Sequence, residues 1–251
     1  MQSFHRILLY NAMSESVFKR FLYCIFPRRC DLCGDVVPIS SKRCDACRHC
    51  EKIEGEACEM CGMDKASCTC KDSHHKPEYE QIVAPFYYSD NAVKAVYRLK
   101  FNGYSELAVT MAEEIVKCIK KQYHNINFDC ITYVPLSADR EKARGYNQSR
   151  LIAEEISKML DIPVEHTFYK AYENPPQRNQ NARMRRANVF GAFDVNDGVN
   201  PQGKTYLVVD DVKTTGATLS ECAAVLDSYG STAVYTAVFA IRKKSARSTA
   251  G

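Results

Sequence analysis

The sequence predicts an α/β protein with a parallel sheet, preceded by a small cysteine-rich lobe. Three observations support this prediction. Strand-type and helix-type segments alternate after residue 78, which is typical of a parallel sheet. Ten of the 13 cysteines lie between Cys24 and Cys70. The 251 residues, 45% apolar and 25% charged, are enough for one sizeable core beside a small lobe.

The chain divides into four predicted parts: 1–29, 30–76, 77–241 and 242–251. The first is a predicted amphipathic helix, because aromatic and aliphatic residues recur at helical spacing from Phe18 to Phe26. The second has few large aliphatic residues, so hydrophobic burial alone cannot stabilise its fold and another kind of cross-link is needed. The last is a basic tail that is expected to fray.

The third part contains the alternating strands and helices. Its strands are apolar runs bounded by turn residues, and its helices place apolar residues at three- and four-residue intervals. The predicted strands are 82–88, 129–134, 205–209 and 233–241, and the predicted helices are 107–120, 150–160 and 218–229. Residues 172–188 show neither the helical nor the strand spacing of apolar residues, so we expect a long functional loop there.

The clustered cysteines indicate metal sites. The chain begins with an apolar run too short for a secretory or membrane segment, so we expect a reducing, cytoplasmic location without membrane insertion. Two residues between cysteines let one turn present both sulfurs to a tetrahedral Zn²⁺. The predicted ligands of the two structural zinc ions are Cys30, Cys33, Cys44 and Cys47 in one site, and Cys58, Cys61, Cys68 and Cys70 in the other. Interleaved pairing stays open, as does Cys50 as a substitute ligand.

Net charge does not by itself indicate a nucleic-acid partner. The chain has 34 basic and 30 acidic residues, a balance of +4. Closed Cys₄ sites leave no open position for chemistry, and eight thiolates around two Zn²⁺ add negative charge to the lobe. The sequence therefore favours a structural role for the lobe.

The segment from Tyr206 to Thr218 carries the strongest functional signal. A buried strand is followed by Asp210 and Asp211, then by a Thr/Gly turn and a helix. Backbone N–H groups at a helix start bind phosphate, and carboxylates suit ribose hydroxyls or Mg²⁺. No basic residue occurs in this segment before Lys213, so the two acids are expected to repel each other without a ligand.

This segment resembles the 5-phosphoribosyl-1-pyrophosphate (PRPP) signature of type I phosphoribosyltransferases: hydrophobics, two acids, then Thr-Thr-Gly-x-Thr. Further motifs follow the cysteine pairs in order: Leu99-Lys100-Phe101-x-Gly103, Val134-Pro135-Leu136, Arg144-Gly145-Tyr146-Asn147-Gln148, Pro176-Gln177, Arg185-x-x-Asn188 and Phe190-Gly191-Ala192-Phe193. Together they resemble the ComF family over about residues 18–239. Family members usually have Thr where this chain has Asn174.

The resemblance implies a type I phosphoribosyltransferase-like, five-stranded parallel sheet with a hood, plus an N-terminal double zinc ribbon. It implies that PRPP binds with Mg²⁺, with residues 172–188 as the hood and with Asn147 framing the pocket. The implied PRPP ligands are Val209, Asp210, Asp211, Lys213, Thr214, Thr215, Gly216, Ala217 and Thr218, together with Leu136, Ser137, Arg140 and Arg144 around the pyrophosphate. The implied catalytic residues are Asp210, Asp211 and Arg183, with Arg185 and Arg186 as further candidates for bracing the pyrophosphate.

Three functions follow from the resemblance and stay open at this point. The first is a phosphoribosyltransferase that displaces pyrophosphate from PRPP. The second is a non-enzymatic factor in DNA uptake that binds single-stranded DNA or a competence helicase. The third is a sensor that binds PRPP without transferring it. All three require the predicted PRPP site or a remnant of it.

Overall fold

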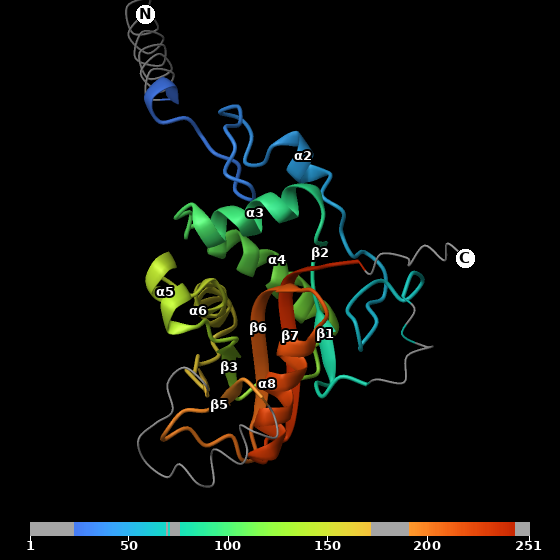
Figure 1. The fold of residues 1–251 in the computed structure, drawn as a ribbon. Helices are drawn as coiled ribbons and strands as arrows, with labels where there is room; N and C mark the ends of the chain where they lie inside the picture. Colours follow the sequence, from blue (N-terminus) through green and yellow to red (C-terminus); the bar gives the residue numbers. More distant parts are fainter. Residues whose placement is uncertain (1–22, 69, 71–75, 172–190, 244–251) are drawn as a thin grey trace, which may run out of the picture.

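A parallel sheet forms the centre of the molecule (Figure 1). The computed structural model of the chain describes residues 23–68, 70, 76–171 and 191–243. The sheet has five strands: β1 (Gln81–Val83), β2 (Phe86–Tyr87), β3 (Cys130–Tyr133), β6 (Thr205–Lys213) and β7 (Ala233–Ile241). Their order is β1-β7-β6-β3, and β2 pairs with the far end of β7. The five-stranded parallel sheet predicted from the sequence is confirmed.

Two of the predicted strands have different limits. The segment 82–88 is split into β1 and β2, because Pro85 between them has no N–H to donate to the ladder. Strand β6 continues four residues beyond the predicted end at Val209, and it pairs with β7 as far as Lys213 and Ile241. The predicted acid pair is therefore part of the strand and does not follow it.

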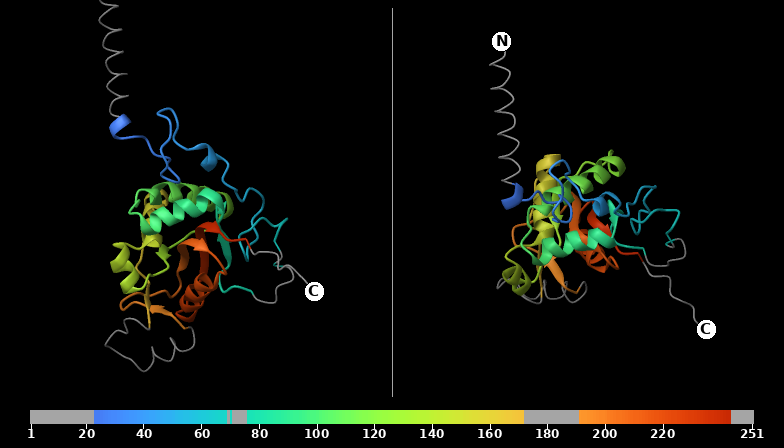
Figure 2. Two further views of the ribbon diagram at one scale, coloured as in Figure 1. Left: turned by 45° about the horizontal axis from the view of Figure 1, so that its top comes forward. Right: turned by 90° about the horizontal axis from the view of Figure 1, so that it is seen from above.

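Helices cover both faces of the sheet (Figures 1 and 2). Successive side chains of β6 point to opposite faces of the sheet, so they belong to two different parts of the core. Leu207 and Val209 pack with α4 (Leu107–Gln122) and α6 (Gln148–Leu160). Tyr206 and Val208 pack with α8 (Ala217–Ser228). These three helices confirm the predicted helices within a few residues. All four side chains named in β6 are fully buried.

Two of the described helices between residues 90 and 160 were not predicted from the sequence. Helix α3 (Asp90–Phe101) buries small residues, Ala92 and Ala95, beside Val96 and Leu99, so its apolar period is weak in the sequence. Helix α5 (Ala138–Arg144) is short, and none of its residues is buried. Hydrophobic periodicity cannot reveal a helix without an apolar face.

A separate two-stranded antiparallel sheet lies below β3 and to the left of α8 in Figure 1. It consists of β4 (Phe168–Lys170) and β5 (Phe193–Val195), and the chain between them contains the predicted hood. Residues 172–190 lie outside the described residues, and so do the predicted residues Arg183, Arg185 and Arg186.

The cysteine-rich lobe packs against α3 and the adjacent sheet edge (Figures 1 and 2). Its helix α2 (Asp45–Arg48) lies beside α3. Leu32 of the lobe is fully buried in a core that also contains residues of α3. The Arg98 guanidinium of α3 donates to the backbone carbonyl of Cys33 and pairs with Asp35 at 2.9 Å. Of the predicted helix 1–29 only residues 23–29 are described, and of the basic tail only 242 and 243. No helix in the described part of the chain could cross a membrane.

Candidate functional site

A cleft of about 390 Å³ opens at the carboxyl ends of β3 and β6. It brings together two loops that the sequence analysis assigned to one ligand. The predicted residues that line it are Leu136, Arg140, Arg144, Asp210, Asp211, Thr214 and Thr218. Residues that were not predicted also line it: Lys100, Gln148, Ser149, Lys170 and Phe193. The carboxyl edge of a parallel sheet is where α/β proteins bind their ligands.

The two acids of β6 are held in different ways. Asp210 Oδ1 accepts hydrogen bonds from Ser149 Oγ at 2.7 Å and from the Asp211 backbone N–H at 2.8 Å. Asp211 is almost fully buried, and Lys100 Nζ lies 2.8 Å from its carboxylate oxygens. No basic residue adjoins these acids in the sequence before Lys213, but the fold brings one to Asp211. That residue is Lys100, from α3, which supplies the positive charge beside Asp211.

The carboxyl group of Asp210 is difficult to ionise. Burial, and then the negative charge of Asp211, raise its pKa from 3.8 to about 7, although the Ser149 hydrogen bond opposes this shift. A ligand that brings a cation or hydroxyl donors to this carboxylate would favour its charged form.

This raised pKa predicts how stability depends on pH. An unfolded aspartate titrates near pH 4, so between about pH 4 and pH 7 the folded protein binds more protons than the unfolded chain. The contribution of Asp210 to stability is therefore present below about pH 4 and is lost as pH rises towards about 7. Replacement by Asp210→Asn removes this dependence. We compare the free energies of unfolding of the variant and the wild type by denaturant unfolding. As pH rises from 4.5 to 8, this difference should shift by about 2–4 kcal/mol in favour of the variant. A difference that does not change with pH would contradict the assignment.

The turn after β6 is shaped for an anion. Gly216 has φ +89°, a left-handed backbone conformation that residues with a Cβ rarely adopt, so the turn favours glycine at this point. Helix α8 begins at Ala217 without a side-chain cap at the residue before it, while Thr215 Oγ1 accepts the Ala217 N–H at 3.3 Å. Thr214 and Thr218 are exposed to the cleft. Hydroxyl groups and N–H groups of a helix start are ready donors for phosphate.

The loop after β3 forms the opposite wall of the cleft. Ser137 is buried and accepts the Arg140 N–H at 3.4 Å, so it caps α5. Asn147 is also buried, and its Nδ2 donates to the Val134 carbonyl at 3.0 Å. Its Oδ1 accepts the backbone N–H groups of the first turn of α6. Asn147 therefore fixes the start of α6, and with it the Ser149 hydroxyl that contacts Asp210.

The other predicted residues that the structure describes, Ser137 included, do not line the cleft. Val209 is fully buried in the core. Lys213, Thr215, Gly216 and Ala217 line a second cavity of about 280 Å³ on the other side of the turn. That cavity also contains Cys61, Cys70 and Tyr79, and the Tyr79 hydroxyl donates to the Met60 carbonyl at 2.8 Å. The phosphate-type turn therefore lies directly against the second cysteine group.

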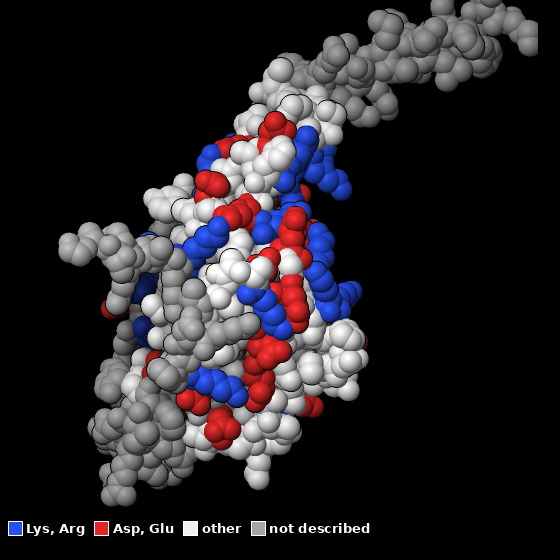
Figure 3. Space-filling view, turned by 90° about the vertical axis from the view of Figure 1, so that its right-hand side faces the viewer, with Lys and Arg blue, Asp and Glu red and all other residues white. Residues whose placement is uncertain are grey.

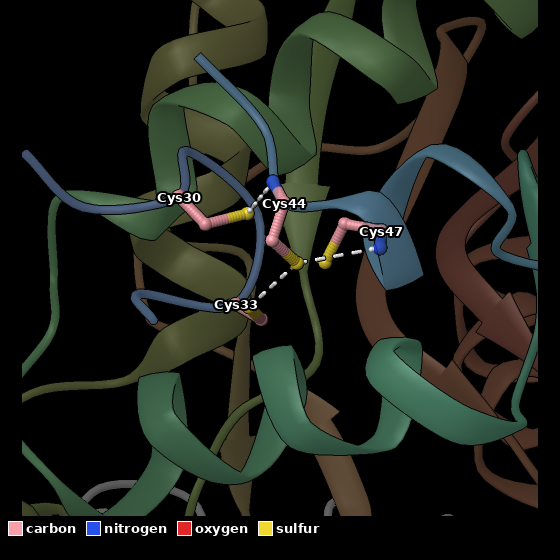
Figure 4. A group of neighbouring side chains, drawn as sticks. All are labelled: Cys30, Cys33, Cys44 and Cys47. Carbon is pink, nitrogen blue, oxygen red and sulfur yellow. Dashed lines mark hydrogen bonds between the residues drawn. The ribbon is translucent and has the colours of Figure 1, made fainter. Parts of the chain in front are cut away.

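The cysteines form two groups, each with four sulfurs within 4.8 Å of one another. The first is Cys30, Cys33, Cys44 and Cys47 (Figure 4). The second is Cys58, Cys61, Cys68 and Cys70. Cys50 belongs to neither group. These groups are consistent with a double zinc ribbon.

The geometry of the first group fits zinc. A Zn–S distance of about 2.3 Å places tetrahedral ligands about 3.8 Å apart, and Cys33 Sγ lies 3.6 Å from Cys44 Sγ. Backbone N–H groups also point at the sulfurs, from Cys44 to Cys30 Sγ at 3.3 Å and from Cys47 to Cys44 Sγ at 3.4 Å (Figure 4). Asn91 of α3 adds a hydrogen bond to Cys47 Sγ at 3.4 Å. Such donors stabilise thiolates and orient metal ligands.

Comparison with known proteins identifies the family. Residues 147–249 match the phosphoribosyl transferase domain. The chain is 31% identical over 161 residues to competence protein F of Haemophilus influenzae, covering 62% of this chain and 70% of that protein. It is 30% identical over 181 residues to the DNA utilization protein YhgH of Salmonella typhimurium, covering 69% and 79% of the two chains. The chain belongs to the ComF family.

The ComF resemblance predicted from the motifs is thus confirmed, as is the type I phosphoribosyltransferase-like fold with a small cysteine-rich lobe. Competence protein ComFC of Bacillus subtilis is 29% identical over 155 residues, covering 62% of this chain and 61% of that protein. Family membership does not define the ligand of the cleft, which depends on the residues described above.

Proposed function

We propose that this ComF-family protein binds PRPP with Mg²⁺ in the cleft between β3 and β6. One observation carries this proposal: the loop after β3 and the turn after β6, which both offer groups that can bind anions, line the same cleft as the acid pair Asp210 and Asp211. Thr214 and Thr218, at the two ends of the turn after β6, offer donors for the 5-phosphate, and Arg140 and Arg144 offer cations for the pyrophosphate. Asp210 and Asp211 suit the ribose hydroxyls. Mg²⁺, when bound, would neutralise the pyrophosphate.

The same proposal gives the two cysteine groups one structural Zn²⁺ each. The first group is hydrogen-bonded to α3, which carries Lys100 and thereby reaches Asp211. The second group lies against the turn that precedes α8. Zinc would therefore fix both sides of the cleft, in addition to folding the lobe.

We further propose that the protein takes part in DNA uptake during natural transformation. The names of the relatives, which refer to competence and to DNA utilization, support this role. The alternative is a non-enzymatic protein that binds single-stranded DNA or a competence helicase and keeps the PRPP site for regulation. A transferase would release pyrophosphate in the presence of its acceptor, and a sensor would bind PRPP without turnover.

Calorimetric titration with PRPP tests the proposed ligand. We expect Mg²⁺-dependent binding of PRPP, and weaker binding of ribose 5-phosphate or pyrophosphate alone. Arg140→Ala should weaken PRPP binding about 10-fold, the effect of losing one charge-assisted contact of roughly 1.4 kcal/mol. Lys142→Ala is the matched control, because Lys142 is exposed on the same helix outside the cleft. If PRPP gives no heat, or if the two variants behave alike, the assignment of the cleft is wrong.

A further inference from the structure

A cavity lined by aromatic rings lies behind the loop that follows β3. Its volume is about 200 Å³, and four of its lining residues carry rings: Tyr133, His166, Phe168 and Tyr169. Tyr133 and Phe168 are almost fully buried. We call this space the ring-lined cavity. The function proposed above uses none of the four rings, because none of them lines the PRPP cleft.

The ring-lined cavity is separate from the proposed PRPP cleft. In α5, Ala138 and Glu141 line this cavity, whereas Arg140 and Arg144 line the cleft. Residues three or four positions apart share one face of a helix, so the two sites lie on different faces of α5. A molecule in the ring-lined cavity would therefore be a second ligand and not a part of PRPP.

Tyr133 and His166 form one wall of the ring-lined cavity. The Tyr133 hydroxyl lies 2.8 Å from His166 Nδ1, and the two rings stack with centroids 5.6 Å apart at an interplanar angle of 22°. Asn196 Nδ2 donates to the backbone carbonyls of His166 at 2.9 Å and Phe168 at 3.3 Å, which holds this wall in place. Burial, and then the charge of Arg150, lower the pKa of His166, and burial raises the pKa of Tyr133. Both rings are therefore uncharged at pH 7, as a wall that contacts an aromatic ring should be.

Two cations and one acid complete the described lining. Arg150 comes from α6, Lys170 comes from β4, and the acid is Glu141. Arg150 also pairs with Glu154 at 2.7 Å, one helical turn further on. Exposed pairs of this kind are weak, so the guanidinium can also bind a ligand carboxylate. The face in Figure 3, by contrast, shows Lys and Arg interspersed with Asp and Glu, without a patch of one sign.

We infer that the ring-lined cavity binds a small aromatic carboxylate, with its ring against Tyr133 and His166 and its carboxylate at Arg150 and Lys170. The volume sets the size of the ligand. Sites for drug-sized molecules are about 300–1,000 Å³, so a cavity of about 200 Å³ suits a single ring with one substituent. The inference goes beyond the proposed function and does not depend on PRPP binding.

This second ligand should weaken PRPP binding. Pro135, Leu136 and Lys170 line both the ring-lined cavity and the cleft. A carboxylate on one side and pyrophosphate on the other are both anions beside the same ammonium group, so they repel each other. Linkage is reciprocal, and we expect each ligand to weaken the other by the same factor of about 5. This linkage, unlike the site itself, rests on the proposed function.

NMR of the histidine ring C–H groups tests the site in the full chain, with benzoate as the probe. The chain has six histidines, and the signal that disappears in His166→Gln belongs to His166. Benzoate should shift this signal with a Kd of about 1 mM or lower, and it should leave the exposed His124, outside the cavity, unchanged. Benzamide lacks the charge and should bind about 10-fold more weakly. Cyclohexanecarboxylate lacks the planar ring and should bind at least about 3-fold more weakly.

Arg150→Gln tests the carboxylate contact. The preference for benzoate over benzamide should fall from about 10-fold to less than about 2-fold. Arg48→Gln is the matched control, because the side chains of Arg48 and Arg150 are 51% and 54% exposed and each pairs with a carboxylate on its own helix. This control should keep the preference. Equal behaviour of the two variants, equal binding of the three probes, or a benzoate shift of His124 as large as that of His166 would overturn the assignment.

Calorimetric titration of PRPP with Mg²⁺, without benzoate and at saturating benzoate, tests the linkage. The Kd of PRPP should rise about 5-fold in the wild type. His166→Gln should bind PRPP alone as the wild type does, because His166 does not line the cleft. An unchanged Kd at saturating benzoate would overturn the linkage. Absence of PRPP binding in both titrations would contradict the proposed function, whereas the benzoate shift of His166 would still support the ring-lined cavity as a site.

Discussion

The double variant Asp210→Asn/Asp211→Asn is expected to lose the thermal stabilisation that PRPP and Mg²⁺ give the wild type. A ligand at 100 times its dissociation constant adds about 2.7 kcal/mol, which in a domain of this size is roughly 5–10 °C in Tm. The two carboxylates are the only acidic side chains among the described residues of the cleft. Without their charges the site cannot hold ribose hydroxyls and Mg²⁺ in the proposed way.

The ligand-free stability of this variant is a separate result. Loss of the Lys100–Asp211 pair is unfavourable, whereas relief of the repulsion between the acids is favourable. The single variant Asp210→Asn keeps the pair, so we expect it to be the more stable of the two at pH 8. Asp139→Asn, on the exposed side of α5, is the control and should keep the full ligand shift. A full shift in the double variant would place the ligand elsewhere.

Removal of metal is expected to unfold the cysteine-rich lobe. Structural zinc sites of this type contribute about 10–16 kcal/mol of apparent binding free energy, and the lobe has few buried aliphatics besides Leu32 and Val37. Protein purified without added metal should contain two zinc ions per chain by elemental analysis. Cys33→Ser and Cys61→Ser should each lose one ion.

Cys24→Ser is the matched control for these variants, because Cys24 is exposed and belongs to neither group. It should keep both ions and the wild-type Tm. The contacts of the two groups with α3 and with the turn before α8 also predict that Cys33→Ser and Cys61→Ser each weaken PRPP binding. Zinc-free protein with an unchanged melting curve would refute the structural role of the metal.

The fold could be predicted to a large extent because its elements carry strong periods. The buried strands β6 and β7 are long apolar runs, and α4 and α6 have one apolar face each. The limits of β6 were harder to predict. The apolar run ends at Val209, while the backbone ladder with β7 continues through polar residues. Side-chain hydrophobicity does not report on backbone pairing.

The candidate site was predicted only where its residues belong to local sequence motifs. Local sequence places Asp210, Asp211 and the turn after them at the edge of a sheet. The family resemblance assigns Leu136 and Arg140 to the same pocket, and both line the cleft. Local sequence cannot show that Lys100, 111 positions away from Asp211, completes the ion pair. Ser149 was missed similarly, because its contact with Asp210 depends on how Asn147 fixes the start of α6. Contacts between distant segments follow from the packing of α3 and α6, which no local motif encodes.

A crystal structure of the protein with PRPP and Mg²⁺ tests the central claim most directly. We expect the 5-phosphate at Thr214 and Thr218, the ribose hydroxyls at Asp210 and Asp211, and the pyrophosphate beside Arg140. Asp211 should then be in contact with both the ligand and Lys100. Density for PRPP at another place on the molecule, or a cleft that stays empty at saturating PRPP, would contradict the account.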